Sequence, residues 1–182
     1  MGDDQRLMEI TFTKLAGRYD IAVHRDVGHA LAPRNGPGFH DAVPHDVAHL
    51  IVETEWGIRG GVYGRLAAAD GDDGMFWAAD PAVKRKATKN RRTPTESESA
   101  DMAKSERLAS LTVALWEVAR GRRRPDPAWP GTEAASGESP ELLQKVYDRY
   151  DDFSRTWSSL PAGRSVTMPW PFPEGVGTRA RL

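Results

Sequence analysis

Four side chains that can bind a metal or carry a proton recur at helical spacing between residues 45 and 53. They are His45, Asp46, His49 and Glu53. At about 100° per residue on an α-helix, these side chains project into an arc roughly 100° wide. The rest of the helix surface is apolar and is formed mainly by Val47, Leu50, Ile51 and Val52. The spacing therefore predicts a helix with one stripe of imidazoles and carboxylates on an otherwise apolar surface.

The residues on either side indicate where this helix begins and ends. Pro44 suits the first turn, where its missing N–H leaves no hydrogen bond unmade. Gly57 suits the C-terminus, because glycine readily adopts the left-handed conformation that closes many helices. A helix that is apolar on most faces is expected to be buried, and buried charges persist when they are paired or bound to a metal. The stripe is therefore the strongest indication of function in the chain.

The stripe predicts a metal site. His45 and His49, at positions i and i+4, can each offer a ring nitrogen to one ion. Glu53 lies one turn further along the same face and is predicted to complete the site, and Asp46 is predicted to orient an imidazole or to carry a proton in catalysis. The chain has no cysteine, so the ligands must be nitrogen and oxygen atoms, and zinc or iron is the expected ion.

The spacing leaves the last ligand open. All the histidines of the chain fall between residues 24 and 49, so several of them could reach the same ion. The further candidates are His24, His29, His40 and Glu55. One of these side chains could complete or extend the set formed by the helix.

Two functional interpretations follow from the stripe. A divalent ion with an open coordination position can bring the pKa of bound water near 7, and two histidines with one carboxylate also suit non-haem iron. If the ion serves catalysis, the expected protein is a metal-dependent hydrolase or lyase that acts on a small molecule. Asp46 stands where zinc peptidases with an H-E-x-x-H motif have their glutamate base, and it is one methylene shorter. The alternative is a non-catalytic interaction protein, with the His/Asp/Glu stripe as a structural polar seam.

Composition limits the partners. The 182 residues include 25 lysines and arginines and 26 acidic residues, and the net charge of −1 creates no general attraction to nucleic acid or anionic membranes. No apolar run approaches the roughly 18 residues that span a bilayer, and the acidic N-terminus lacks the core of a signal peptide. We therefore expect a cytoplasmic protein without a membrane or nucleic-acid partner. Contact of the basic segments 84–92 and 120–124 with phosphates is a weaker hypothesis.

The elements around the histidine-bearing helix predict an α+β fold. Alternating apolar residues on both sides of Gly17 predict a β-hairpin, residues 29–32 are a candidate third strand, and alternation near Trp170 with nearby prolines predicts an edge strand. The apolar positions of these strands are Ile10, Phe12, Tyr19, Ile21, Val23, Val166, Met168 and Trp170.

Two more helices are predicted in the second half of the chain. Thr95 and Glu98 form a capping box before an amphipathic stripe that includes Leu108 and Leu111. Ser139 and Pro140 open another helix, and segments 84–98 and 122–138 are expected to be exposed loops. The sequence thus predicts a single domain over residues 1–182, with a small N-terminal antiparallel sheet, three main helices and a C-terminal edge strand.

Two resemblances attach to these motifs. Segments 10–23, 44–57, 60–68 and 166–172, together with a tryptophan-containing late helix, resemble an uncharacterised family of small bacterial proteins. At the level of one motif, His45-Asp46-x-x-His49 resembles the H-D-x-x-H metal motif of the helical ubiquinone-biosynthesis proteins. In that family a glutamate follows the second histidine by twelve positions, whereas Gly61 occupies that position here. The resemblance implies metal binding and, by analogy, quinone-ring chemistry.

Overall fold

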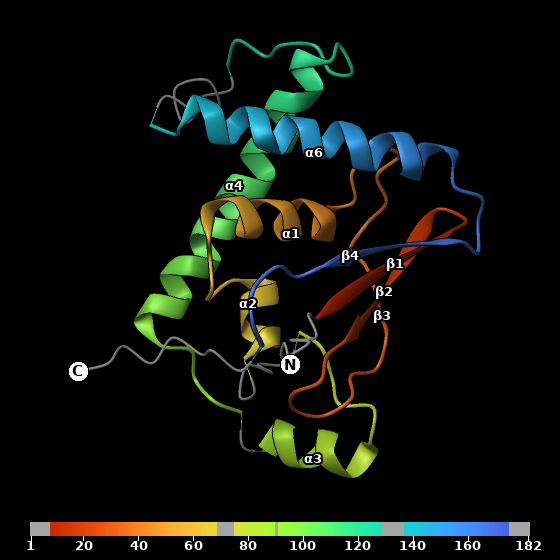
Figure 1. Ribbon diagram of the computed structural model, residues 1–182, viewed down its shortest axis with the longest axis vertical. Helices are drawn as coiled ribbons and strands as arrows, with labels where there is room; N and C mark the ends of the chain where they lie inside the picture. Colours follow the sequence, from red (N-terminus) through yellow and green to blue (C-terminus); the bar gives the residue numbers. More distant parts are fainter. Residues whose placement is uncertain (1–7, 69–74, 90, 129–136, 175–182) are drawn as a thin grey trace, which may run out of the picture.

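A four-stranded antiparallel sheet lies beside a layer of helices (Figure 1). The computed structural model describes residues 8–68, 75–89, 91–128 and 137–174. The strands are β1 (Glu9–Leu15), β2 (Arg18–His24), β3 (Arg34–Asn35) and β4 (Ser165–Pro169), in the spatial order β3-β2-β1-β4. The predicted hairpin is confirmed, with Gly17 in its turn at a φ of 66°, and so is the predicted C-terminal edge strand.

One face of the sheet is apolar, as the alternation predicted. Ile10 and Phe12 of β1 pair with Val23 and Ile21 of β2, and on the other side with Met168 and Val166 of β4. Helix α6 (Pro140–Ser159) packs on this face. The rings of Phe12 and Phe153 lie 6.2 Å apart, and those of Tyr19 and Trp157 lie 6.3 Å apart, both edge to face. Such aromatic pairs add to the stabilisation that burial of apolar area already provides.

The three predicted main helices are α1 (His45–Trp56), α4 (Glu96–Ala119) and α6. Gly57 ends α1 in the left-handed conformation, with a φ of 64°. The Thr95–Glu98 capping box opens α4, and Ser139 caps α6 with Pro140 in its first turn. The sheet and these helices make the predicted α+β fold.

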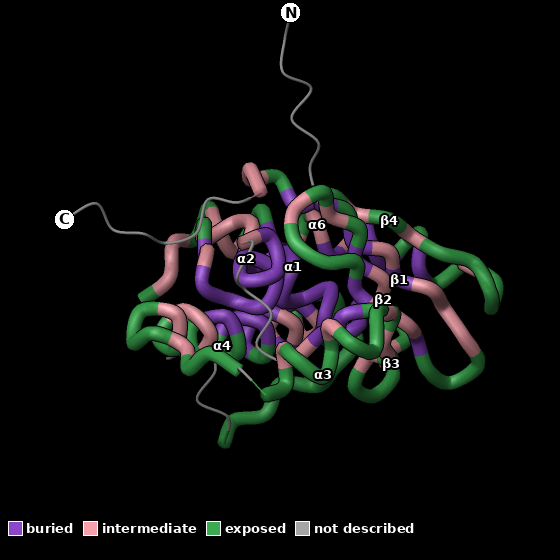
Figure 2. The backbone as a smooth tube through the Cα atoms, turned by 90° about the horizontal axis from the view of Figure 1, so that it is seen from below, coloured by how far each residue is buried: buried purple, intermediate pink, exposed green. Residues whose placement is uncertain are grey.

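Helix α1 lies at the centre of the molecule. It contacts α4, α6 and the short helix α2 (Val62–Ala67), and every residue from Asp46 to Glu53 is buried. Figure 2 shows this helix as the buried middle of the molecule, with exposed residues around it. The described residues form one hydrophobic cluster that runs from the sheet through α1 to α6.

Two details differ from the expectations. The strand at the sheet edge is at residues 34–35, whereas Ala30 and Ala32 form backbone hydrogen bonds with Ala79 and Trp77 in an isolated bridge. Part of the segment expected to be the loop 84–98 is helical, since α3 spans Pro81–Lys89 and α4 begins at Glu96. Helix α3 forms because Asp80 accepts a hydrogen bond from the Ala82 N–H and Pro81 occupies the first turn.

Segment 122–138, the other expected loop, falls partly outside the described residues. Its described residues carry no helix or strand. Among the helices that the structure describes, none combines the length and apolar character needed to cross a membrane.

Candidate metal centre

The two histidines of α1 point their Nε2 atoms at each other. These atoms lie 3.0 Å apart, and the rings meet edge to face with centroids separated by 4.6 Å. The helical spacing of one turn brings His45 and His49 together, as predicted. His49 is buried, with 2% of its side chain exposed, whereas His45 is 42% exposed.

Helix α4 supplies a carboxylate to the same point. Glu106 Oε2 lies 3.7 Å from His45 Nε2 and 3.4 Å from His49 Nε2. The three side chains each offer one ligand atom, and these atoms all lie within 4.8 Å of one another. A tetrahedral ion with bonds of about 2.0–2.1 Å separates its ligand atoms by about 3.3–3.4 Å. The observed separations of 3.0, 3.4 and 3.7 Å bracket that value, so this cluster could hold a metal ion.

The other nitrogen of His49 is held by a hydrogen-bonded chain. The Ser105 hydroxyl donates to Glu53 Oε1 at 2.7 Å, and its oxygen lies 2.7 Å from His49 Nδ1. Because this hydroxyl donates its proton to Glu53, its oxygen accepts one from Nδ1–H. This assignment leaves the lone pair of Nε2 directed at His45 and Glu106. An outer partner that fixes the tautomer in this way is typical of metal-ligating histidines.

Burial favours the neutral form of His49, which is the form that binds a metal. Removal from water lowers the pKa of His49, and the neighbouring His45 lowers it further, whereas Glu106 and Asp46 act in the opposite direction. A neutral imidazole offers a free lone pair, whereas a protonated one cannot bind a cation.

Glu53 faces away from the cluster. Its carboxylate is fully buried and accepts hydrogen bonds from the N–H groups of Val62 (2.6 Å) and Tyr63 (2.9 Å) at the start of α2. Burial raises the pKa of Glu53 to about 7, against the lowering effect of hydrogen bonds from Ser105, Tyr63 and Val62. Its nearest approach to His49 is 3.9 Å, at Nδ1. Of the two carboxylates, Glu106 and not Glu53 belongs to the cluster with the Nε2 atoms.

Gly61 makes room for this arrangement. A Cβ atom at Gly61 would lie 2.3 Å from Glu53 Oε1, which is far inside contact distance. Residue 61 therefore has no room for a side chain, because the Glu53 carboxylate packs at this position.

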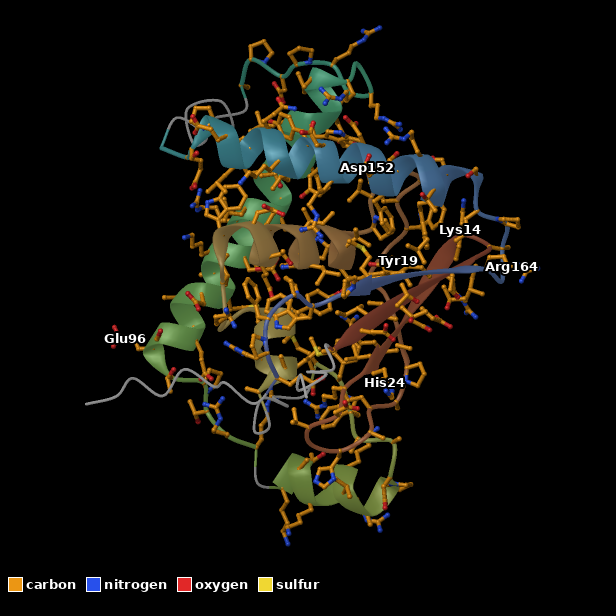
Figure 3. All side chains as sticks on the ribbon, in the orientation of Figure 1. Lys14, Tyr19, His24, Glu96, Asp152 and Arg164 are labelled. Carbon is orange, nitrogen blue, oxygen red and sulfur yellow. The ribbon has the colours of Figure 1, made fainter. Side chains whose placement is uncertain are left out.

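Asp46 joins α1 to the sheet. Its carboxylate accepts a hydrogen bond of 2.6 Å from the Tyr19 hydroxyl and is ion-paired with Arg34, whose guanidinium stacks on the Phe76 ring. Tyr19 lies at the end of α1 nearest the sheet (Figure 3). The structure thus places Asp46 in a buried anchor between α1, β2 and β3. Its predicted role as a proton carrier stays a prediction.

The four alternative ligands lie outside the cluster. His24 and His29 are exposed, and Figure 3 shows His24 at the end of the sheet away from α1. His40 Nε2 lies 3.0 Å from Glu117 Oε1, and its Nδ1 accepts hydrogen bonds from the backbone of residues 42 and 43. Glu55 is paired with Arg149 at 2.6 Å.

Sequence reasoning missed Ser105 and Glu106. Both lie on α4, more than 50 positions after His49, so no local spacing connects them to α1. One signal was present, because Ser105 is a polar residue one turn before Leu108 on the buried stripe of α4. A buried hydroxyl needs a hydrogen-bond partner, and this one indicates that the facing helix carries a polar group.

The described cluster is thus of the two-histidine, one-carboxylate class, built by α1 and α4. Comparison of the chain with protein-family models, curated proteins and solved structures found no match.

Proposed function

We propose that the protein binds one divalent metal ion, zinc or iron, through His45 Nε2, His49 Nε2 and the Glu106 carboxylate. The observation that carries this proposal is the convergence of three ligand atoms from two helices at separations suited to one ion. This set replaces the predicted ligand Glu53 with Glu106. Glu53 acts instead through Ser105, which fixes the tautomer of His49.

The proposed ion keeps a coordination position open to solvent. His45 and Glu106 are 42% and 54% exposed, so the outer side of the cluster is accessible to water. Structural zinc sites usually have four protein ligands, whereas catalytic sites have three and a bound water. Three ligands with an accessible fourth position therefore support metal-activated water chemistry, and the same set would serve non-haem iron.

One observation favours the alternative of a structural polar seam. The contact of 3.0 Å between the Nε2 atoms of His45 and His49 is also a good distance for a hydrogen bond between two neutral imidazoles. In that case Glu106 would be a surface carboxylate beside the pair, and the protein would be a non-catalytic interaction protein.

Metal content separates the two functions. Wild-type protein purified without chelator is expected to carry about one zinc or iron per chain by elemental analysis, because the ligand set is preorganised. Chelation should lower the melting temperature and added metal should restore it, since an ion at about 100 times its Kd stabilises the native state by about 2.7 kcal/mol. A metal-free wild type whose melting temperature does not respond to zinc, iron or manganese would support the polar seam.

Glu106→Gln is the sharpest variant, because Glu106 is half exposed and its loss should leave the fold intact. We expect this variant to weaken metal binding by about 10-fold or more, as judged from the loss of a charged ligand. Glu96→Gln on the same helix and His29→Ala, both at exposed positions, are matched controls that should bind as wild type. His49→Ala should abolish binding, and it additionally removes one of the two hydrogen-bond partners of Ser105, which keeps its bond to Glu53.

A further inference from the structure

A pocket opens beside the candidate metal centre. It has a volume of about 320 Å³ and lies between residues 37–43, the start of α1 and one face of α4. Its apolar lining is formed by Phe39, Val43, Ala109, Val113 and Ala114. This volume is at the lower end of the range of small-molecule sites.

The pocket adjoins the metal cluster through one shared residue. His45 lines the pocket and also belongs to the cluster. Ser110 lines it too, and this residue follows Glu106 by four positions on α4, so the two share one face of that helix about one turn apart. A molecule in the pocket would therefore have one end at the accessible side of the cluster.

The polarity of the pocket indicates the kind of molecule. Phe39 is the exposed large apolar side chain among the described residues, at 41%, and it lines this pocket. The charged groups of the lining, Glu117 and Arg123, lie 3.9 Å from each other, and Glu117 also contacts His40 at 3.0 Å. These charges partly satisfy one another, which leaves the apolar surface to receive the ligand.

We propose that this pocket binds the apolar body of a small molecule whose oxygen-bearing head group coordinates the ion at His45, His49 and Glu106. The inference rests on the proposed metal site and adds the class of substrate. The body is about the size of one aromatic ring or a short branched alkyl chain, and the head is a group such as a carboxylate, carbonyl or hydroxamate that can bind zinc or iron through oxygen.

The test uses two hydroxamates that share a head group and differ in their body. Zinc-loaded wild-type protein is titrated calorimetrically with acetohydroxamate and with benzohydroxamate, and zinc content is measured after each titration. Benzohydroxamate is expected to bind at least about 10-fold more tightly, because binding transfers its phenyl ring from water into the apolar pocket. Ser110→Trp should remove this preference, since Ser110 is exposed and a larger side chain there would fill the pocket.

Two further variants complete the design. Phe39→Ala should reduce the preference for benzohydroxamate, and we expect this variant to fold because Phe39 is 41% exposed and stands outside the buried core. Ala100→Trp adds the same bulk at an exposed site of α4 that does not line the pocket, so it should bind both probes as wild type. Equal affinity of the two probes, or an undiminished preference in Ser110→Trp, in protein that retains its zinc would overturn the inference and leave the proposed metal site standing. Wild-type protein that takes up no metal would overturn both.

Discussion

The two ring nitrogens of His49 have different surroundings, and this difference assigns them different roles. Nδ1 faces the buried pair of Ser105 and Glu53, whereas Nε2 faces His45 and the accessible Glu106. The buried side holds the ring and selects its tautomer, and the accessible side is available for a ligand. The sequence predicted the two histidines because one helix places them together, but it could not place Glu106, because only the packing of α4 on α1 does so.

Glu53 is expected to make the stability of the metal-free protein depend on pH. Burial raises its pKa to about 7 from an ordinary value of 4.5, so between these values the native state binds a proton that the unfolded state releases. The contribution of Glu53 to the free energy of unfolding is therefore fully present below about pH 4.5 and is lost as the pH rises through about 7. At 1.36 kcal/mol per pKa unit, this loss is about 3 kcal/mol.

Glu53→Gln isolates this effect, because His49, whose lowered pKa acts with the opposite sign, is present in both proteins. Denaturant unfolding of chelator-treated protein at pH 5, 6, 7 and 8 should show that the substitution destabilises most at pH 5 and least at pH 8. Glu96→Gln, at an exposed position, should show no such trend. A difference between wild type and Glu53→Gln that is constant over this range would contradict the assigned pKa.

The N-terminal cap of α4 should affect the stability of the protein without affecting its affinity for metal. The Thr95 hydroxyl accepts from the Glu98 N–H at 3.2 Å, and Glu98 Oε2 accepts from the Thr95 N–H at 2.8 Å. Thr95→Ala is expected to cost about 1 kcal/mol in the free energy of unfolding. Glu106 lies about 16 Å from Thr95 along the helix axis, so zinc affinity by calorimetry should match wild type. Thr93→Ala is the control, because Thr93 takes no part in the capping box. A loss of zinc affinity in Thr95→Ala would show that the first turn of α4 helps to position the site.

Elements with local signals could be predicted from the sequence. The hairpin around Gly17, the capping box at Thr95 and the Ser139-Pro140 helix start all depend on neighbours in the chain. Helix α3 also had a local signal at Asp80-Pro81, but its many cations and lack of an apolar stripe favoured a loop.

Contacts between distant segments were not predictable. The third strand formed at 34–35 and not at 29–32, because the extended chain before it pairs with residues 77–79. Glu53 was predicted to bind a metal because it shares a face with His49. In the structure, its carboxylate accepts hydrogen bonds from the first N–H groups of α2. The first N–H groups of any helix have no partner within the helix, so they can bind such a carboxylate.

In the whole molecule, the sheet separates an apolar interior from a hydroxyl-bearing outer surface. The helices cover one face, and on the other Thr11 pairs with Thr167, and Thr13 with Ser165, through hydroxyl contacts of 2.9 Å. These contacts join β1, near the start of the chain, to β4, near its end. The two halves of the chain are thus held together by the sheet as well as by the contact of α1 with α4.

Helix α3 is the expected site of first cleavage by trypsin. None of its residues is buried, and it carries Lys84, Arg85, Lys86 and Lys89. A helix without buried side chains opens at little cost in free energy. Limited digestion should therefore give two main fragments on a denaturing gel, with N-terminal sequences that place the cut at 84–89. Early cleavage elsewhere, such as within α4, would contradict this expectation.

A chain cut within α3 would become a two-part assembly whose association can be measured. One fragment would carry β1, β2, β3, α1 and α2, and the other α4, α6 and β4. The proposed ion would then bridge two separate polypeptides, with His45 and His49 on one and Glu106 on the other. The fragments, separated in denaturant and mixed again, should recombine more tightly with zinc than with chelator. Cleavage within α3 would thus convert the protein into two fragments whose association depends on metal.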